Sequence, residues 1–401
     1  MCGKLALPNA LHQPKLKAYL THGIFHMKKL KNLYSKICTF ENLLQAYRNA
    51  VKNKRYREEV LIFSQNLEAN LFALLDELKN RTYRVGKYRE FYVNYPKRRL
   101  VMALAFPDRI VQWAIYQQIN PFIDKRFITH SYGCRNGKGS LAAVQQLHSW
   151  IQAVSRKPDA GDWRIVKLDI SKYFYRIDHP TALNVYKEYI EDEWFDWLIR
   201  TIICDDNVPF GLPPGRSADE CPRSERLYDV GLPIGNLTSQ ETANAYLDRL
   251  DKFCKHRLGI KYYIRYVDDV DLIIKAEDVE AVKDAIEDFL WTALKLSLNN
   301  KTCVCRIDQP VEFVGCIITP HGIRLRKRTV RHAKRAMKHI EEMYAIGAID
   351  LDSALDTIRS YIGMSQHKNG YNLRRWIEEN IVLQRNGTRR EQAYESISES
   401  R

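Results

Sequence analysis

The chain has 401 residues, of which 45% are hydrophobic, enough for two or three domain-sized units or one multi-lobed enzyme. Lys and Arg number 63 against 48 Asp and Glu, and the net charge of +15 favours a polyanionic partner such as nucleic acid. Nine cysteines without paired spacing and no apolar stretch of membrane-spanning length argue against a disulfide-rich, zinc-binding or membrane protein. The N-terminus lacks the basic and apolar regions of a signal peptide, so we expect a cytoplasmic protein.

The first hundred or so residues change from a helical to a strand pattern. Leucines and aromatic residues at helical spacing over 26–80 predict two or three amphipathic helices, the last ending at Asn80. The β-branched and aromatic stretch that follows predicts a strand pair turning at 95–97. The pattern is helical again over 107–127.

The middle of the chain begins with a glycine-punctuated basic loop, SYGCRNGKGS, over 131–140. A helix is predicted from there through Val154, and the apolar run WRIVKLDI (163–170) predicts a strand that ends in a carboxylate. Helices are expected over 180–203. The proline- and glycine-rich stretch 209–226 is typical of a surface loop.

The last part opens with the loop GLPIGNLTSQ (231–240), which leads into a helix reaching about Arg257. A strand hairpin over 261–274, a helix over 277–296 and a strand pair over 301–319 follow, before a mostly helical C-terminal unit. Strands separated by unequal helical insertions indicate an α+β fold.

Two adjacent aspartates stand inside the apolar hairpin KYYIRYVDDVDLII. A buried carboxylate without a partner costs several kcal/mol, so Asp268 and Asp269 call for something positive. Asp169 ends the earlier strand, and if the two strands are neighbours, Asp169 and Asp268 face each other across the sheet. Oxygen ligands of this kind suit Mg²⁺, and two such ions about 3.5–4 Å apart serve polymerases and nucleases. Taken singly, Asp169 is better explained as the N-cap of a helix over SKYFYRI.

The segments VKLDISKYF, GLPIGNLTSQ and RYVDDVDLI, in this order, resemble three palm motifs of reverse transcriptases. RRLVMALAFPDRIVQWAI and SYGCRNGKGS resemble the finger motifs of the bacterial enzymes. LSLNNKT and VEFVGCII are similar to the lysine segment and the primer-grip hairpin, and SYIGMSQHKNGYNLRRWI to the start of the thumb. The resemblance extends over roughly residues 60–385.

The resemblance implies a right-hand polymerase with an antiparallel palm sheet. Its expected parts are a helical N-terminal extension (1–75), fingers (76–160), a catalytic palm (161–319), a helical thumb (320–385) and a flexible tail (386–401). The thumb would lie along the template–primer duplex.

The resemblance also implies the catalytic residues. Asp169 and Asp268 would be the principal ligands of two Mg²⁺ ions, for which Mn²⁺ is a substitute, with Asp269 in a secondary role. The backbone carbonyl of Ile170 would be a further ligand. Lys301 lies where the family places a lysine near the leaving pyrophosphate, a general acid by analogy, although an exposed lysine before a strand is common.

Substrate contacts follow in the same way. Arg98 and Arg99 would lie over the incoming triphosphate, since guanidinium groups match phosphate oxygens, and the alternative for either is a solvated edge charge. Phe174 stands where the family keeps a ring that blocks a ribose 2′-hydroxyl; the alternative is core packing. An aromatic residue there argues for deoxynucleotides. The basic loop SYGCRNGKGS would contact template or support the fingers.

The loop LPIGNLTSQ departs from the commonest pattern. Gly235 would let the backbone approach the nascent base pair, while Ser239 and Gln240 open the next helix. Most reverse transcriptases have Gln before this glycine and Ser-Pro at the end of the loop, whereas this chain has Ile234 and Ser239-Gln240. The variant resembles enzymes of diversity-generating retroelements and some defence-associated bacterial enzymes. Because isoleucine removes a polar contact beside the templating base, error-prone cDNA synthesis is the resulting hypothesis.

The expected partners are an RNA template, a primer–cDNA duplex and dNTPs, with an accessory protein or a structured non-coding RNA as further candidates and no membrane. The expected setting is a diversity-generating retroelement in the bacterial cytoplasm, with antiphage defence as the alternative. An RNA-dependent RNA polymerase is a rival that Phe174 argues against. A catalytically silent nucleic-acid-binding scaffold is another, and the intact Asp169, Asp268 and Asp269 argue against it.

Overall fold

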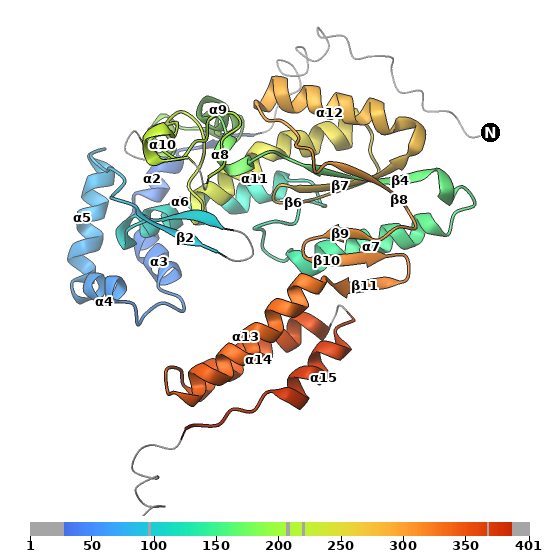
Figure 1. The fold of residues 1–401 in the computed structure, drawn as a ribbon. Coiled ribbons are helices and arrows are strands. Elements are labelled where there is room, and N and C mark those ends of the chain that lie inside the picture. The colour runs from blue at the N-terminus through green and yellow to red at the C-terminus, as the bar shows by residue number, and fades with distance from the viewer. Residues whose placement is uncertain (1–27, 95–97, 206–208, 219–220, 367–368, 387–401) are drawn as a thin grey trace, which may run out of the picture. The chain divides into compact units, whose positions relative to one another are not determined.

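The computed structural model describes residues 28–94, 98–205, 209–218, 221–366 and 369–386. The chain forms two compact units, which are described separately below (Figure 1). The larger unit contains 1–139 and 166–304, and the smaller one contains 140–165 and 305–401. The turn expected at 95–97 and the tail from residue 387 onward lie outside the described residues. No helix of the described chain is both long and apolar enough to span a bilayer.

The larger unit begins with short helices. A side-chain cap starts the second of them, because the Thr39 side chain accepts a hydrogen bond from the Asn42 backbone N–H. The last one ends at Lys79 with Asn80 as its cap, as the sequence predicts. Breaks after Ile37 and at Asn66 divide the expected two or three helices into α2 (Leu33–Ile37), α3 (Phe40–Ala50), α4 (Glu58–Gln65) and α5 (Leu67–Lys79).

An antiparallel hairpin and a long helix come next. Strands β2 (Arg89–Val93) and β3 (Arg99–Ala103) pair with Val93 opposite Arg99, which confirms the predicted strand pair. Helix α6 (Phe106–Ile123) is followed by one 3₁₀ turn and packs against α3. Its buried face runs along most of its length, because apolar residues recur at helical spacing.

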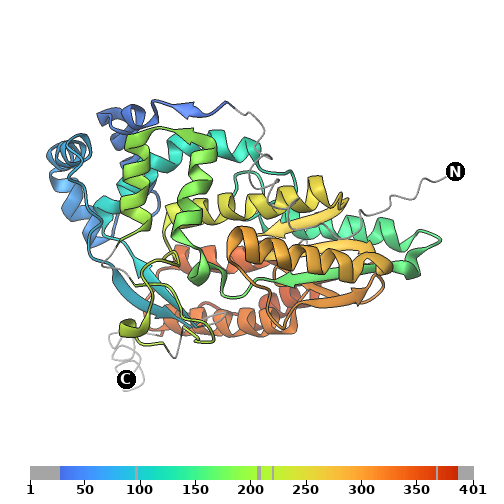
Figure 2. The same cartoon turned by 90° about the horizontal axis from the view of Figure 1, so that it is seen from above.

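A four-stranded sheet has the order β6-β7-β4-β8, and its strands β6 and β7 lie wholly in the larger unit. Its hairpin β6–β7 is antiparallel, and β7 lies next to β4, so the strands carrying the aspartates are neighbours. Helix α12 covers one face of the sheet (Figures 1 and 2). The elements are β4 (Trp163–Asp169), β6 (Tyr262–Tyr266), β7 (Asp269–Lys275), β8 (Cys303–Arg306) and α12 (Val279–Leu294).

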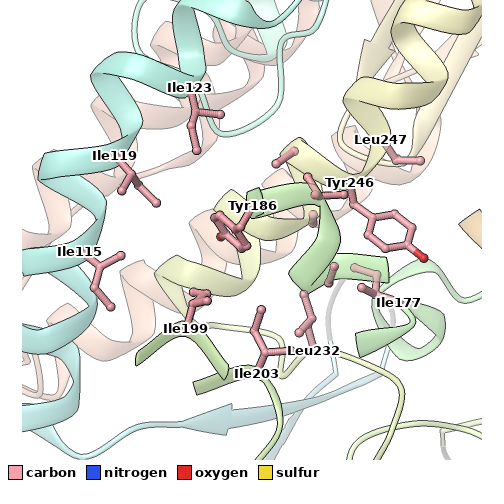
Figure 3. Close-up of a cluster of buried hydrophobic side chains, with 14 of the residues drawn as sticks. Ile115, Ile119, Ile123, Ile177, Tyr186, Ile199, Ile203, Leu232, Tyr246 and Leu247 are labelled. Atoms are coloured by element: carbon pink, nitrogen blue, oxygen red, sulfur yellow. The ribbon is translucent and has the colours of Figure 1, made fainter. Parts of the chain in front are cut away.

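Figure 3 draws one part of the main core, where buried side chains of α6, α9, α10 and α11 gather. Isoleucines of α6 face Tyr186 of α9 and Ile199 of α10, whereas the Tyr246 ring of α11 points away from α6. These side chains are almost fully buried, so the helices hold α11 firmly beside the sheet. The elements are α8 (Tyr173–Arg176), α9 (His179–Tyr189), α10 (Glu193–Ile203) and α11 (Leu237–Lys252), the last continuing as a π-helical turn. A two-residue parallel pair, β1 (Leu30–Lys31) with β5 (Ile190–Glu191), was not predicted.

The smaller unit combines helices with an antiparallel sheet. Three strands pair in the order β11-β10-β9, and the C-terminal helices pack around Met337, Leu373 and Ile377. The prediction of one strand pair over 301–319 was wrong, because β8 joins the central sheet and the short strand β11 completes the other one. The elements are α7 (Ser140–Ser155), β9 (Val311–Phe313), β10 (Cys316–Thr319), β11 (Gly322–Leu325), α13 (Lys327–Ala345), α14 (Leu351–Gln366) and α15 (Tyr371–Asn380).

Candidate active site

The turn between β6 and β7 carries Asp268. Val267, just before it, has φ of 58°, a left-handed conformation that is strained for a β-branched residue. A Cβ on Gly133 would come within 2.6 Å of the Val267 backbone nitrogen, so only glycine fits beneath the turn. The Arg265 guanidinium donates to the Val267 carbonyl oxygen at 2.9 Å. The turn is therefore held from below in the strained form that presents Asp268.

Arg265 itself belongs to a buried network. Its Nε and Nη2 donate to the two carboxylate oxygens of Asp251 at 2.7 and 2.6 Å, and both side chains are 0% exposed. Tyr263 donates to the same carboxylate at 2.6 Å, and Asn244 donates to the Gly133 carbonyl at 2.8 Å. A bidentate pair with further hydrogen bonds is the geometry that a buried ion pair requires. This network was not predicted from the sequence, although an arginine inside an apolar strand is a signal for a buried partner.

The second carboxylate, Asp169, stands at the end of β4. The Asn299 side-chain amide donates to Asp169 Oδ2 at 2.6 Å, and the Asn299 backbone N–H donates to the Asp169 carbonyl oxygen at 2.9 Å. The Asp169 N–H donates to the Thr302 hydroxyl at 3.3 Å. The helix after Asp169 begins at Tyr173 with Lys172 as its cap, so the N-cap alternative for Asp169 was wrong. The segment LSLNNKT orients Asp169 instead, and Asn299 was not predicted.

Asp268 and Asp269 differ in the charges that surround them. Burial, followed by the charge of Asp269, raises the pKa of Asp268 above its usual range. Lys167, on β4, lies 3.4 Å from Asp269 Oδ1. Burial alone would lower the pKa of Lys167, but the charges of Asp271 and Asp269 raise it overall. Asp268 thus lies where a further cation would stabilise its ionised form.

A cavity of about 1010 Å³ opens over the carboxylates. The structure brings most of the predicted residues to it: its lining includes Arg98, Arg99, Asp169, Ile170, Phe174, Ile234, Asp268, Asp269 and Lys301. Ile170 is buried and lies opposite Leu298 in an isolated antiparallel β-bridge. The two backbone hydrogen bonds of this bridge run from Ser171 to Ser297 and from Asn299 to Asp169, so neither uses the carbonyl oxygen of Ile170. Lys301 is exposed, and its backbone N–H donates to Asn299 Oδ1.

The described residues contain no group of three or more His, Cys, Asp or Glu side chains arranged to hold a metal ion by themselves. The donor set still fits Mg²⁺, because this ion keeps several waters and takes one or two carboxylates together with substrate phosphates. Asp169 and Asp268 supply those oxygens on one wall of the cavity.

A second, smaller cavity of about 330 Å³ has different chemistry. Gly235 lines it, with φ of 112°, and a Cβ there would lie 3.2 Å from Val101. Gln240 lines it too, whereas Ser239 is 5% exposed and the structure brings it to neither cavity. The remaining lining includes the cations Lys54, Arg57, Arg89 and Arg109 and the rings of Phe91 and Trp113.

The two cationic side chains of the basic loop SYGCRNGKGS bond to groups of the protein itself. Arg135 pairs with Asp124 at 2.6 Å and donates to the carbonyls of Ile128 and Ser131 at 2.8 Å, leaving its side chain 6% exposed. Lys138 donates to the Thr129 carbonyl at 2.9 Å. Of the two roles predicted for this loop, these contacts favour support of the fingers.

The model of the family described as reverse transcriptase (RNA-dependent DNA polymerase) matches residues 93–318, more than half of the chain. The chain belongs to the reverse transcriptase family. The match contains every predicted site residue and makes the protein an RNA-directed DNA polymerase by class. Enzymes of this family generally use divalent metal ions.

Two curated proteins resemble this reverse transcriptase in sequence. Protein YkfC of Escherichia coli is 26% identical over 285 residues, which cover 62% of this chain and 71% of that protein. A putative COX1/OXI3 intron 2 protein of Saccharomyces cerevisiae is 24% identical over 152 residues. The second match spans 37% of this chain and only 15% of the yeast protein.

Among solved structures, one of telomerase from Candida albicans in complex with a fragment of telomeric RNA is similar. The TM-score is 0.43 at 11% identity, and the match covers 81% of this chain and 60% of the telomerase chain.

Proposed function

We propose that this reverse transcriptase copies an RNA template by adding dNTPs to a primer 3′-hydroxyl with two Mg²⁺ ions, releasing pyrophosphate. The observation that carries the proposal is the convergence of Asp169, Asp268 and two arginines on one cavity inside the matched family region. Asp169 and Asp268 would hold the ions, with Asp269 and the Ile170 carbonyl as secondary ligands. When bound, the ions would activate the primer oxygen and stabilise the leaving oxygen.

The chain's own residues would do the rest by positioning and electrostatics. Arg98 and Arg99 line the same cavity as the carboxylates and would bind the triphosphate. Lys301 would give a proton to the leaving pyrophosphate. Asn299 would keep the Asp169 carboxylate pointed into the cavity through its 2.6 Å hydrogen bond.

The wall formed by Phe174 and Ile234 would select the nucleotide. Phe174 lines the cavity after the turn that follows Asp169, where a bulky ring would exclude a ribose 2′-hydroxyl. Ile234 offers no hydrogen bond to the templating base, so the enzyme would discriminate poorly between bases. Replacing Ile234 by Gln should lower misincorporation on an RNA template. Equal fidelity of the wild type and Ile234→Gln would contradict this part of the proposal.

The smaller cavity would hold the template strand ahead of the site. It lies along the same edge of β3 and the same loop as the larger one, since Ile234 lines one cavity and Gly235 the other. Lys54, Arg57 and Arg89 with two aromatic rings suit a phosphate backbone with stacked bases, whereas Arg109 pairs with Glu59 at 2.8 Å. Arg57, Arg89 and Arg109 also line a third space of about 500 Å³, together with Lys87 and the acidic Glu58 and Glu59.

The expected parts of the right hand complete the proposal: fingers over 76–160, palm over 161–319 and thumb over 320–385. The proposed setting is a diversity-generating retroelement in the bacterial cytoplasm, with antiphage defence as the alternative. The departure from the commonest motif at Ile234 and Ser239-Gln240 fits both settings. A neighbouring accessory gene with paired template and variable repeats would support the first setting, and their absence would favour the second.

Primer extension on an annealed RNA template, with dNTPs and rNTPs supplied separately, tests the core of the proposal. We expect DNA synthesis with dNTPs and Mg²⁺ and little extension with rNTPs. Efficient extension with rNTPs alone would replace this proposal by an RNA-dependent RNA polymerase.

A further inference from the structure

Two short arms of the segment between α10 and α11 lie side by side behind the Phe174 wall. We call residues 209–212 and 227–234 the clamp arms. Gly211 and Leu227 exchange backbone hydrogen bonds of 3.0 and 2.9 Å. A Cβ on Gly211 would lie 2.5 Å from the Val230 carbonyl oxygen, so the arms touch where no side chain fits.

Both clamp arms are bonded to the backbone around α8. The Leu232 N–H donates to the Phe174 carbonyl at 2.7 Å, and the Gly231 N–H donates to the Ile177 carbonyl at 2.8 Å. The Leu212 N–H reaches the Tyr175 carbonyl at 3.4 Å. Because α8 is only four residues long, it needs such support from outside to keep its place.

The side chains meet in a small apolar cluster. Phe210, which is 1% exposed, stacks on Tyr175 with ring centroids 4.6 Å apart and planes 14° apart. Leu100 and Met102 of β3 complete its buried part, and Tyr88, Phe174, Tyr175 and Ile234 pack against it. Phe174, Tyr175 and Ile234 line the cavity, whereas Phe210 stands among the buried members.

We propose that Phe210 is a positioning residue for nucleotide selection, which fixes the ring of Phe174 without touching the nucleotide. The inference rests on the proposed function, specifically on Phe174 as the barrier to a ribose 2′-hydroxyl. A barrier excludes a hydroxyl only if it cannot move aside. Phe174 packs against the cluster that contains Phe210, and Phe210 stacks on the neighbouring Tyr175, so loss of the Phe210 ring would give Phe174 room to move. Ile234 is supported by the same cluster, and its carbonyl accepts the Met102 N–H at 3.3 Å.

The test measures the ratio of kcat/KM for a dNTP to kcat/KM for the matching rNTP on an RNA template. Phe210→Leu leaves unfilled space behind Phe174, and we expect the ratio to fall about 10-fold. Phe195→Leu is the matched control, because Phe195 of α10 is 0% exposed and lies outside the cluster. A merely structural role would lower stability in both variants and change the ratio in neither.

A double-mutant cycle separates this inference from the proposed function. Phe174→Ala should abolish most of the discrimination, and adding Phe210→Leu to it should change the ratio no further. An unchanged ratio in Phe210→Leu beside a collapsed ratio in Phe174→Ala would overturn the inference and leave the function standing. An equal fall caused by Phe210→Leu in both backgrounds would also overturn it. An unchanged ratio in Phe174→Ala, or no DNA synthesis by the wild type, would contradict both the role of Phe174 as the barrier to a ribose 2′-hydroxyl and the inference about Phe210.

Discussion

Two groups of residues that line the main cavity differ in how they are supported. We call Asp169 and Asp268 the carboxylate wall, and Arg98 and Arg99 the arginine wall. The carboxylate wall rests on buried groups: Arg265 and Asp251 are 0% exposed beneath the turn that carries Asp268, and Asn299 fixes Asp169. The arginine wall lies at the end of the β2–β3 hairpin where Val93 pairs with Arg99; Arg98 and Arg99 are exposed there, and Arg98 lies 4.2 Å over the Tyr92 ring.

The difference matches the work that each wall would do. Groups that stabilise a transition state gain from being fixed before the substrate arrives, because no free energy is then spent on ordering them during the reaction. Groups that capture a charged, mobile substrate gain from exposure. Substitutions beneath the carboxylate wall should therefore affect stability or the chemical step, and those on the arginine wall should affect nucleotide binding.

The largest effect is expected at the carboxylates themselves. Asp268→Asn keeps the shape of the side chain and removes its charge, so single-turnover nucleotide addition should fall by about 1000-fold or more. Binding of the RNA–DNA hybrid should be unchanged. Asp284→Asn, at an exposed position of α12, is the control and should react like the wild type. Retained synthesis by Asp268→Asn would show that the Asp268 carboxylate is not needed for the reaction.

The support beneath that wall should matter next, through folding stability. Arg265→Met leaves Asp251 buried without its partner and should lower the free energy of unfolding by about 3–5 kcal/mol. Replacing both residues by apolar ones should recover most of that loss. Denaturant unfolding measures all three proteins, and a single variant as stable as the wild type would contradict a buried ion pair.

A buried carboxyl of α11 predicts a pH dependence. Burial raises the pKa of Glu241 from 4.5 to about 8, so the folded protein keeps a proton that the unfolded chain releases between these pH values. Stability should therefore fall as pH rises through this window. Glu241→Gln removes the effect, and its advantage over the wild type should grow from pH 4.5 to 8, reaching on the order of 5 kcal/mol. Parallel stability curves for the two proteins would contradict the raised pKa.

The hydrogen bond to Asp169 should have a smaller effect on the reaction. Asn299→Ala frees the carboxylate to rotate, and we expect the Mg²⁺ concentration at half-maximal rate to rise about 10-fold or more. Thr302→Ser keeps the hydroxyl that accepts from the Asp169 N–H and should behave like the wild type. A wild-type metal requirement in Asn299→Ala would show that Asp169 needs no such partner.

The smallest effect is expected on the arginine wall. Arg99→Ala should raise KM for the incoming dNTP about 10-fold with a smaller change in kcat, since it removes charge-assisted bonds to phosphate. Its unfolding free energy should stay within about 0.5 kcal/mol of the wild type, as for other exposed positions. A stability loss like that of Arg265→Met would erase the distinction between the two walls.

The carboxylate wall was predictable in part. Asp169 ends an apolar strand and Asp268 lies in the turn of an apolar hairpin, so the two would meet only if their strands are neighbours, and β7 does lie beside β4. The helix–strand order of the larger unit was predictable for the same reason, because strand and helix periods are local properties.

The supporting residues could not be predicted in this way. Asn299 reaches Asp169 across 130 positions of the chain, and Gly133 is fixed by the turn at Val267. Such contacts depend on how distant elements pack. Ser239 illustrates a further limit: consecutive residues of a helix point about 100° apart, so Gln240 reaches a cavity while its neighbour faces the core.

The proposed role of Asp169 and Asp268 is RNA-directed DNA synthesis. It is tested by single-turnover addition of one dNTP to a DNA primer on an RNA template, at increasing Mg²⁺, by the wild type and Asp268→Asn after both are shown to bind the hybrid. We expect extension by the wild type that rises with Mg²⁺, and none above background by the variant. Equal extension by both proteins, or none by a wild type that binds the hybrid, would contradict it.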